Sequence, residues 1–304
     1  MMTRILTSLV GVPLILVLLF WPGGWPWFFF VAAVMAMAIY EFTKALWAKG
    51  IYVHWIALAF FGVLAITRAA PALMGLEGRI GLERPLMFVI GGSVFPEFAA
   101  LFVMLLLAGD LLWKRRSPLK NVGATFLGMG WIALTLPFLV DIRRVGQSAA
   151  NHTVLPDAVT PPLGAQEGAW LMFAVLLVIW AGDSGAYFVG KAIGRHKMAP
   201  GISPNKTWEG SVGGLAASWI VGMAMTWPLA LNPLTCLLFG LVVGAVGQVG
   251  DLVESAIKRE IGIKDFGDLL PGHGGVLDRF DSLIFAAPVA FFILYPGGVV
   301  RFLR

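Results

Sequence analysis

Apolar stretches recur along the whole of this chain, and each is close to the length that crosses a bilayer as a helix, about 20 residues. Hydrophobic residues make up 59% of the 304 residues, whereas charged residues make up only 13%. A water-soluble protein of this length would not need so few charges on its surface. The sequence therefore predicts an all-α, polytopic integral membrane protein.

The apolar stretches predict about nine transmembrane helices. The first is expected to be a retained helix rather than a signal peptide, because Trp and Pro residues follow it in place of a small-residue cleavage site. Pro96 and Glu97 interrupt the fourth stretch, so that helix can begin there. The predicted spans lie near residues 4–22, 25–46, 54–72, 88–112, 122–141, 168–190, 209–230, 233–257 and 283–302.

The distribution of Lys and Arg residues predicts the orientation. A cytoplasmic N-terminus places most of the 22 Lys and Arg residues in cytoplasmic loops, in agreement with the positive-inside rule. The formal net charge of +5 then reflects topology and contact with anionic membrane lipids, and we expect no nucleic-acid partner. The single cysteine, Cys236, excludes an intrachain disulfide and is expected to be a small buried side chain.

Polar and charged residues concentrate between positions 181 and 282. They fall in three segments, AGDSGAYFVGKAIGRHK, SPNKTWEG and GQVGDLVESAIKREIGIKDFGDLLPGHGGVLDRFD. Earlier in the chain, we interpret Glu41, Lys44 and Asp110 as charges at helix ends in the membrane interface. The chemistry is therefore expected in the C-terminal half.

Four polar residues of the third segment share one face of a helix, because their spacing is i, i+3, i+4 and i+7. They are Asp251, Glu254, Ser255 and Lys258. After a turn, three more charged residues open the last predicted span: Asp278, Arg279 and Asp281. A plain ion pair between Glu254 and Lys258 explains those two residues equally well. It does not explain why acids and bases come together from two separate helix ends.

Several carboxylates beside several cations suit a metal-bound polyphosphate. Carboxylate oxygens hold Mg²⁺ while phosphates complete its shell, and Lys and Arg neutralise the phosphate oxygens. A zinc hydrolase is a poor competitor, because only four His occur and none is in a His-Glu-x-x-His motif. The sequence also has no Gly-x-Ser-x-Gly nucleophile elbow and no Walker-type glycine loop.

Residues 255–281 resemble the signature of the phosphatidate cytidylyltransferases, also called CDP-diacylglycerol synthases. The shared pattern is Ser-x-x-Lys-Arg, four residues, Lys-Asp, a Pro-Gly-His-Gly-Gly turn and Asp-Arg-x-Asp. Residues 183–197 and 203–210 are similar to further motifs of that family. The resemblance covers about 181–282, and outside it the chain matches only as a run of membrane helices.

The resemblance implies that CTP and phosphatidate react to give CDP-diacylglycerol and pyrophosphate, as a step of phospholipid biosynthesis. The expected cofactor is Mg²⁺, alone or with a second cation. We assign Asp251 and Asp278 as its ligands, with Glu254 and Asp281 as additional ligands or as carboxylates that support them. The full catalytic set is Asp251, Asp278, Lys258, Asp281 and Glu254. The substrate-binding set is Ser203, Lys206, Thr207, Asp183, Arg259, Lys264, His273 and Arg279. For His273, a role in stabilising the turn is an equal alternative.

We expect two regions, N-terminal helices at 1–165 and a catalytic region at 166–304 with cytoplasmic loops 191–208 and 258–281. The expected location is a bacterial-type inner membrane, with the N-terminus and the active site in the cytoplasm. A homodimer is left open. Two alternatives remain: a CTP-using transferase acting on a different lipid phosphate or alcohol, and a transporter. The transporter is disfavoured because the charges cluster at one face rather than at the midplane.

Overall fold

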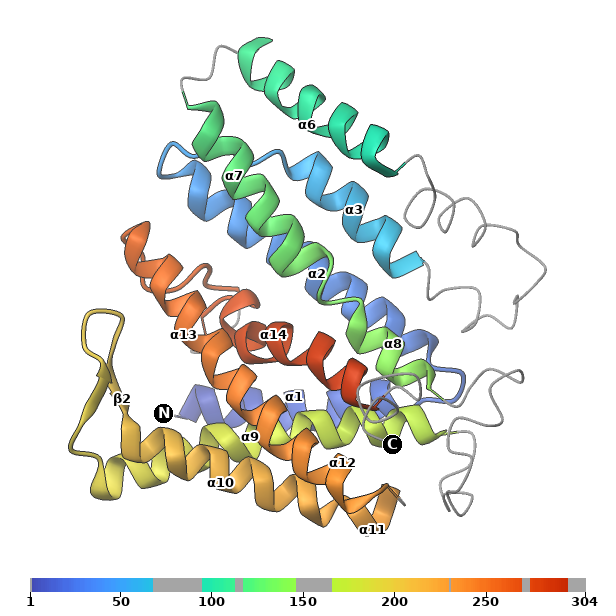
Figure 1. The fold of residues 1–304 in the computed structure, drawn as a ribbon, viewed down its shortest axis with the longest axis vertical. Helices are drawn as coiled ribbons and strands as arrows, with labels where there is room; N and C mark the ends of the chain where they lie inside the picture. The colour runs from blue at the N-terminus through green and yellow to red at the C-terminus, as the bar shows by residue number, and fades with distance from the viewer. Residues whose placement is uncertain are drawn as a thin grey trace.

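The computed structural model describes residues 2–67, 95–112, 117–145, 166–229, 231–269 and 274–294, with the side chains of residues 2–8 and 95–99 left aside. Its helices form two groups (Figure 1). Helices α2, α3, α6 and α7 run side by side across the upper part of the view. Helices α1, α9 and α10 run across the lower part, and α13 and α14 lie between the two groups.

The predicted spans each overlap a helix of the described chain. The N-terminal helices are α1 (Met2–Phe20), α2 (Trp25–Trp47), α3 (Trp55–Thr67), α6 (Phe95–Leu112), and α7 (Pro118–Gly128) continued by η1 (Met129–Ala133) and α8 (Phe138–Arg144). The C-terminal helices are α9 (Glu167–Ile193), α10 (Trp208–Ala224), α11 (Thr226–Leu229), α12 (Pro233–Leu238) continued by η4 (Phe239–Val243) and α13 (Gly244–Glu260), and α14 (Leu277–Leu294). Pro96, where the interrupted apolar run allowed a helix to begin, lies at the start of the described part of α6.

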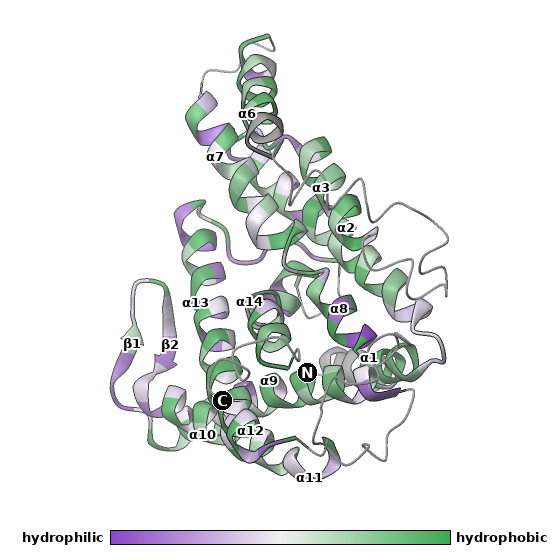
Figure 2. Ribbon diagram, turned by 45° about the vertical axis from the view of Figure 1, so that its right-hand side comes forward, coloured by the Kyte–Doolittle hydropathy of each residue, from purple (hydrophilic) through white to green (hydrophobic). Residues whose placement is uncertain are grey.

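Four helical stretches of the described chain are long and apolar enough to cross a membrane. They are Trp25–Trp47, Pro118–Arg144, Glu167–Ile193 and Pro233–Glu260. Hydrophilic residues gather at the hairpin between α9 and α10 and at the far end of α13, whereas α3 and α6 are mostly hydrophobic (Figure 2). These features support a helical integral membrane protein. The count of nine crossings stays a prediction.

A short β-hairpin joins α9 to α10, where the sequence had predicted only a loop. Strand β1 (Lys197–Ala199) pairs antiparallel with β2 (Ser203–Thr207), with Lys197 opposite Thr207 and Ala199 opposite Ser203. The side chain of Thr207 then caps α10 by accepting a hydrogen bond from Gly210 N at 3.2 Å. Within the described residues, this hairpin forms the one β-sheet of an otherwise helical fold.

Glycines let α9 and α10 pack closely beneath the hairpin. A Cβ atom on Gly213 would lie 2.5 Å from the Val189 side chain, and one on Gly185 would lie 2.7 Å from Ala217 Cβ. Small residues at such an interface allow the helix backbones to approach. The close contact holds the hairpin in place at the ends of both helices.

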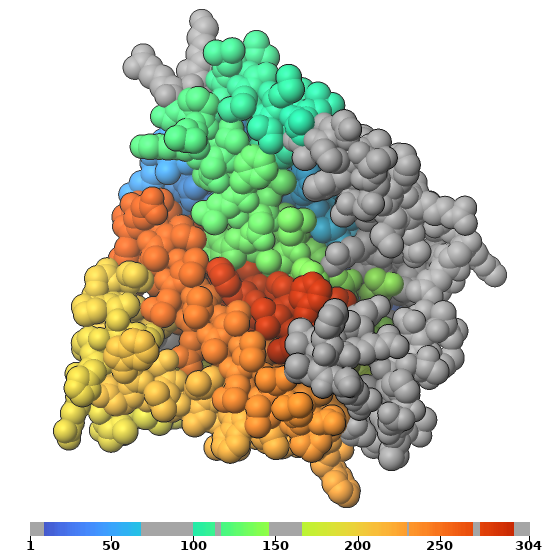
Figure 3. Space-filling view, viewed as in Figure 1, coloured from blue at the N-terminus to red at the C-terminus, as the bar shows by residue number. Residues whose placement is uncertain are grey.

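One hydrophobic core joins the N-terminal and C-terminal helices. It includes Leu58 and Leu139 from the first half and Met172 and Leu277 from the second, all fully buried. Figure 3 shows α14 (red) lying between α13 (orange) and the α7–α8 segment (green). The N-terminal helices therefore support the segment that carries the signature.

Candidate active site

Helices α13 and α14 come close together where their charged residues lie. A Cβ atom on Gly250 of α13 would lie 2.9 Å from both the carbonyl oxygen of Asp281 and the Cβ of Phe285 on α14. A side chain at this position would push the two backbones apart. Glycine thus brings the acidic residues of α13 next to those of α14.

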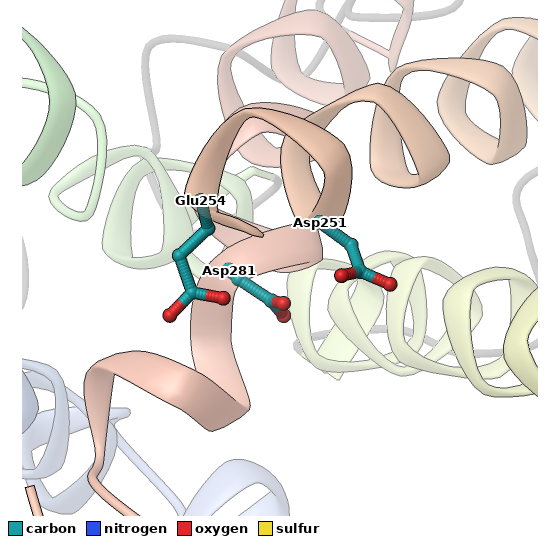
Figure 4. Close-up of side chains that lie close together, drawn as sticks. All are labelled: Asp251, Glu254 and Asp281. Carbon is teal, nitrogen blue, oxygen red and sulfur yellow. The ribbon is translucent and has the colours of Figure 1, made fainter. Parts of the chain in front are cut away.

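Three carboxylates converge between these helices. Oxygen atoms of Asp251, Glu254 and Asp281 all lie within 4.8 Å of one another, and the three side chains point into the same space (Figure 4). The predicted shared face of Asp251, Glu254, Ser255 and Lys258 is confirmed, because Ser255 Oγ donates to Asp251 Oδ1 at 3.4 Å and Lys258 Nζ donates to Glu254 Oε2 at 3.1 Å along α13.

The chemistry of this acidic group fits a hard divalent cation. Glu254 is fully buried, and no hydrogen-bond donor among the described residues reaches its Oε1 atom. A buried carboxylate that lies beside other carboxylates is costly unless a cation offsets the charge. Mg²⁺ and Ca²⁺ prefer carboxylate oxygens, so Asp251, Glu254 and Asp281 form a suitable ligand set.

Lys258 links the two helices. Its Nζ atom lies 3.1 Å from Glu254 Oε2 and 2.9 Å from Asp278 Oδ1. The ion pair between Glu254 and Lys258, which the sequence left open as a plain intrahelical contact, is therefore part of a bridge from α13 to α14. The Lys258 side chain is only 12% exposed, so this bridge is largely shielded from solvent.

Asp278 is not one of the three carboxylates whose oxygen atoms lie within 4.8 Å of one another. Besides Lys258, it contacts the loop that joins the helices, since its Oδ2 atom accepts hydrogen bonds from Phe266 N and Gly275 N, both at 2.9 Å. These contacts hold the loop between α13 and α14, here called the signature loop, against the start of α14. The role of Asp278 as a metal ligand stays a prediction.

The hairpin brings Lys206 to the acidic group. Its Nζ atom lies 2.6 Å from Asp251 Oδ2. Asp183 on α9 interacts electrostatically with Asp281, Asp251 and Lys206. Ser203 occupies the first position of β2, opposite Ala199. The structure thus gathers Asp183 and Lys206 with the acids of α13 and α14.

The other predicted substrate-binding cations border this region. Arg259 connects the hairpin to α13, because it donates hydrogen bonds to the carbonyl oxygens of Ile202 and Ile263, each at 3.2 Å. Lys264, in the loop after α13, and Arg279, in the first turn of α14, are both exposed. His273 lies outside the described residues.

Two acidic residues were misinterpreted from the sequence. Glu41 is 3% exposed and Asp110 is fully buried, so neither is a solvated charge at the interface. Asp110 accepts a hydrogen bond from Asn121 Nδ2 at 2.9 Å and lies 3.0 Å from His54 Nε2. Glu41 contacts the signature loop. Their partners come from distant segments, which spacing along one helix does not reveal.

Residues 2–296 match the sequence profile of the cytidylyltransferase family. The chain belongs to the cytidylyltransferase family. The resemblance predicted from residues 255–281 is thereby confirmed.

Three curated relatives match over most of their length, and each bears the name phosphatidate cytidylyltransferase. The Bacillus subtilis protein is 34% identical over 264 residues, which cover 83% of this chain and 88% of the relative. The Synechocystis protein is 32% identical over 301 residues, covering 96% and 95% respectively. The Staphylococcus haemolyticus protein is 47% identical over 228 residues, covering 72% and 84%.

Proposed function

We infer that this protein transfers a cytidylyl group from CTP to phosphatidate, giving CDP-diacylglycerol and pyrophosphate in phospholipid biosynthesis. The observation that carries this inference is the match of the chain to proteins named phosphatidate cytidylyltransferase over 83% and 96% of its length. The acidic group of α13 and α14, flanked by Lys206 and Lys258, supplies the chemistry that the reaction needs.

In the reaction, an oxygen of the phosphatidate phosphate attacks the α-phosphorus of CTP. A new P–O–P bond forms as the bond between the α- and β-phosphates breaks, and pyrophosphate leaves with the electron pair. The attacking oxygen is already anionic, so no side chain has to act as a nucleophile. The protein contributes by orienting two anionic substrates and by stabilising the charge that develops during transfer.

Asp251, Glu254 and Asp281 would hold the divalent cation, and Asp278 is the further ligand that we propose on the basis of the signature. When bound, Mg²⁺ neutralises phosphate oxygens and favours departure of the pyrophosphate. This assignment is supported by the separation of the three carboxylates, within 4.8 Å, and by the buried Oε1 atom of Glu254 that has no donor among the described residues.

We assign the phosphates of the substrates to the cations around the acidic group. Lys206 lies on the hairpin and has a flexible side chain. Its ammonium group can therefore leave Asp251 and bind a phosphate of CTP instead. Lys258 would offset charge between α13 and α14. The remaining proposed contacts to substrate are Ser203, Asp183, Arg259, Lys264, His273 and Arg279. The hydroxyl of Thr207 caps α10, so its contribution is to hold the hairpin in place.

We propose that the protein lies in the bacterial cell membrane with this site at the cytoplasmic face. Phosphatidate then arrives from the bilayer and CTP from the cytoplasm. Support comes from the position of the charges, at the C-terminal end of the Pro233–Glu260 helix and the N-terminal end of α14. Such a position also disfavours a transporter, whose site lies near the midplane. The homodimer is a prediction that sedimentation of the detergent-purified protein tests.

The experiment is a product assay on purified protein in detergent with tritium-labelled CTP, Mg²⁺ and a panel of lipids. We expect labelled CDP-diacylglycerol with phosphatidate, and little product with a diacylglycerol or an isoprenoid phosphate. Product only with one of those other lipids would favour the alternative transferase. The absence of product from a folded sample, across several phosphatidates, would contradict the proposal.

A further inference from the structure

The loop between α13 and α14 is held by two carboxylates that lie on different helices. Asp278 Oδ2, on α14, accepts the hydrogen bonds from Phe266 N and Gly275 N. Glu41, near the C-terminal end of α2, accepts from Val276 N at 3.0 Å through Oε1 and from Leu277 N at 2.9 Å through Oε2. Val276 directly precedes α14, and Leu277 is its first residue.

The loop is shaped around the Glu41 side chain. A Cβ atom on Gly267 would lie 2.5 Å from Glu41 Oε1, and one on Gly275 would lie 2.6 Å from Glu41 Oε2. Both positions need glycine for the loop to close over the carboxylate. Beside it, the ring of Phe42 packs against the ring of Phe266, with centroids 6.1 Å apart. Adjacent residues of α2 thus contact both ends of the loop.

A carboxylate suits this position for two physical reasons. The first N–H groups of a helix have no partner within the helix, and they are costly when buried unless an acceptor reaches them. The helix dipole places partial positive charge at the same end, which favours a negative side chain there. Glu41 meets both needs for α14, although it belongs to a helix far away in the sequence.

We propose that Glu41 is a positioning residue for the cytidylyl transfer: it fixes the first turn of α14 and, through it, Asp278 and Asp281. This inference rests on the proposed function. Glu41 accepts hydrogen bonds from Val276 N and Leu277 N, the two residues that precede Asp278. Asp281 follows one turn later on the same helix. Loss of the two hydrogen bonds would loosen the start of α14 and displace its acids from Asp251 and Lys258.

The test compares Glu41→Ala and Glu41→Gln with the unmodified protein and with Asp110→Asn. Asp110 is a suitable control because it is also a buried carboxylate, and its polar partners, His54 and Asn121, lie outside α13 and α14. Glu41→Gln keeps the side-chain shape and one acceptor oxygen, so it remains informative if Glu41→Ala does not fold.

Three measurements are made on the folded fraction of each variant. Hydrogen exchange of the peptide containing Val276 and Leu277 should be at least about tenfold faster in Glu41→Ala, with a smaller effect in Glu41→Gln. The kcat should fall at least about tenfold while the KM for CTP changes less, because the loss falls on alignment rather than on binding. Mg²⁺ should raise the melting temperatures of the unmodified protein and of Asp110→Asn to the same extent, and should raise those of the Glu41 variants less.

A merely structural role would give a different result. If Glu41→Gln and Glu41→Ala lowered only the yield or the melting temperature and kept the kcat and the Mg²⁺ response, the proposal would be overturned. Equal losses of kcat in Asp110→Asn would overturn it too. Failure of the proposed function would be recognised separately, as the absence of product from the unmodified protein, since the hydrogen-exchange and Mg²⁺ measurements need no turnover.

Discussion

Replacement of Lys258 by methionine removes the cation between α13 and α14 while keeping the length of the side chain. Its ammonium group contacts Glu254 at 3.1 Å and Asp278 at 2.9 Å, and its side chain is 12% exposed. Removal of one partner from a buried ion pair costs about 3–5 kcal/mol, because the other charge stays buried. For a chain of this size, that cost lowers the melting temperature by about 5–15 °C.

Lys206→Met is the matched control. Lys206 also contacts a carboxylate, Asp251 at 2.6 Å, but the two side chains are 25% and 34% exposed. The ammonium nitrogen of Lys206 is itself buried, but the carboxylate it contacts is more exposed than the partners of Lys258. Loss of this ion pair should therefore lower the melting temperature less than loss of the Lys258 bridge does. Both variants should lose most of their activity, because each lacks a cation beside the acidic group.

The single cysteine provides the assay. Cys236 is fully buried, so a fluorogenic thiol reagent reports unfolding as the side chain becomes accessible during heating. The measurement is made in detergent without substrate, and activity is assayed separately on unheated samples. Equal melting temperatures for Lys258→Met and Lys206→Met would refute the argument that the Lys258 bridge is a structural ion pair as well as part of the site.

Three further predictions follow from the site and the orientation. Asp251→Asn should lower turnover by orders of magnitude without unfolding the protein, because it removes a carboxylate from the proposed cation site. Near-normal activity of this variant would exclude Asp251 as a ligand. Lys206→Ala should raise the KM for CTP or lower kcat at least about tenfold, whereas Lys120→Ala, at an exposed position, should change neither; equal losses would mean that bulk positive charge matters instead. With Cys236 replaced, a cysteine at position 120 should react with an impermeant reagent from the cytoplasmic side and one at position 155 from the outside; the opposite pattern would invert the proposed orientation.

The sequence was most informative where the charged residues of the proposed site follow the spacing of a helix. The positions of the helices followed from the apolar runs. The shared face of Asp251, Glu254 and Lys258 followed from helical spacing, and the signature independently pointed to Lys258, Asp278 and Asp281. Spacing could not assign individual carboxylates, because it does not show which oxygen faces which neighbour. For that reason the sequence placed Asp281 and Glu254 beside the metal without deciding their roles, and it did not predict that Asp278 contacts Lys258 and the loop backbone.

The short hairpin and the long-range contacts of Glu41 could not be predicted from the sequence. The hairpin has strands of three and five residues, too short for a clear alternating pattern, so residues 197–207 were predicted as a loop. Glu41 was interpreted as an interfacial charge because nothing near it in the sequence suggests a partner. Its partners, Val276 and Leu277, lie 235 and 236 residues away, and only the packing of α2 against the signature loop brings them together.

The central claim is transfer of the α-phosphate of CTP, with its cytidine, to a lipid phosphate at the acidic group of α13 and α14. The most direct measurement follows the label from two forms of CTP, one with ³²P in the α-phosphate and one with ³²P in the γ-phosphate, during incubation with the purified protein, Mg²⁺ and phosphatidate. We predict that the α-label enters the lipid fraction as CDP-diacylglycerol and that the γ-label appears in pyrophosphate, with neither transfer in Asp251→Asn. Transfer of the γ-label to lipid, or equal transfer of the α-label by Asp251→Asn, would contradict the account.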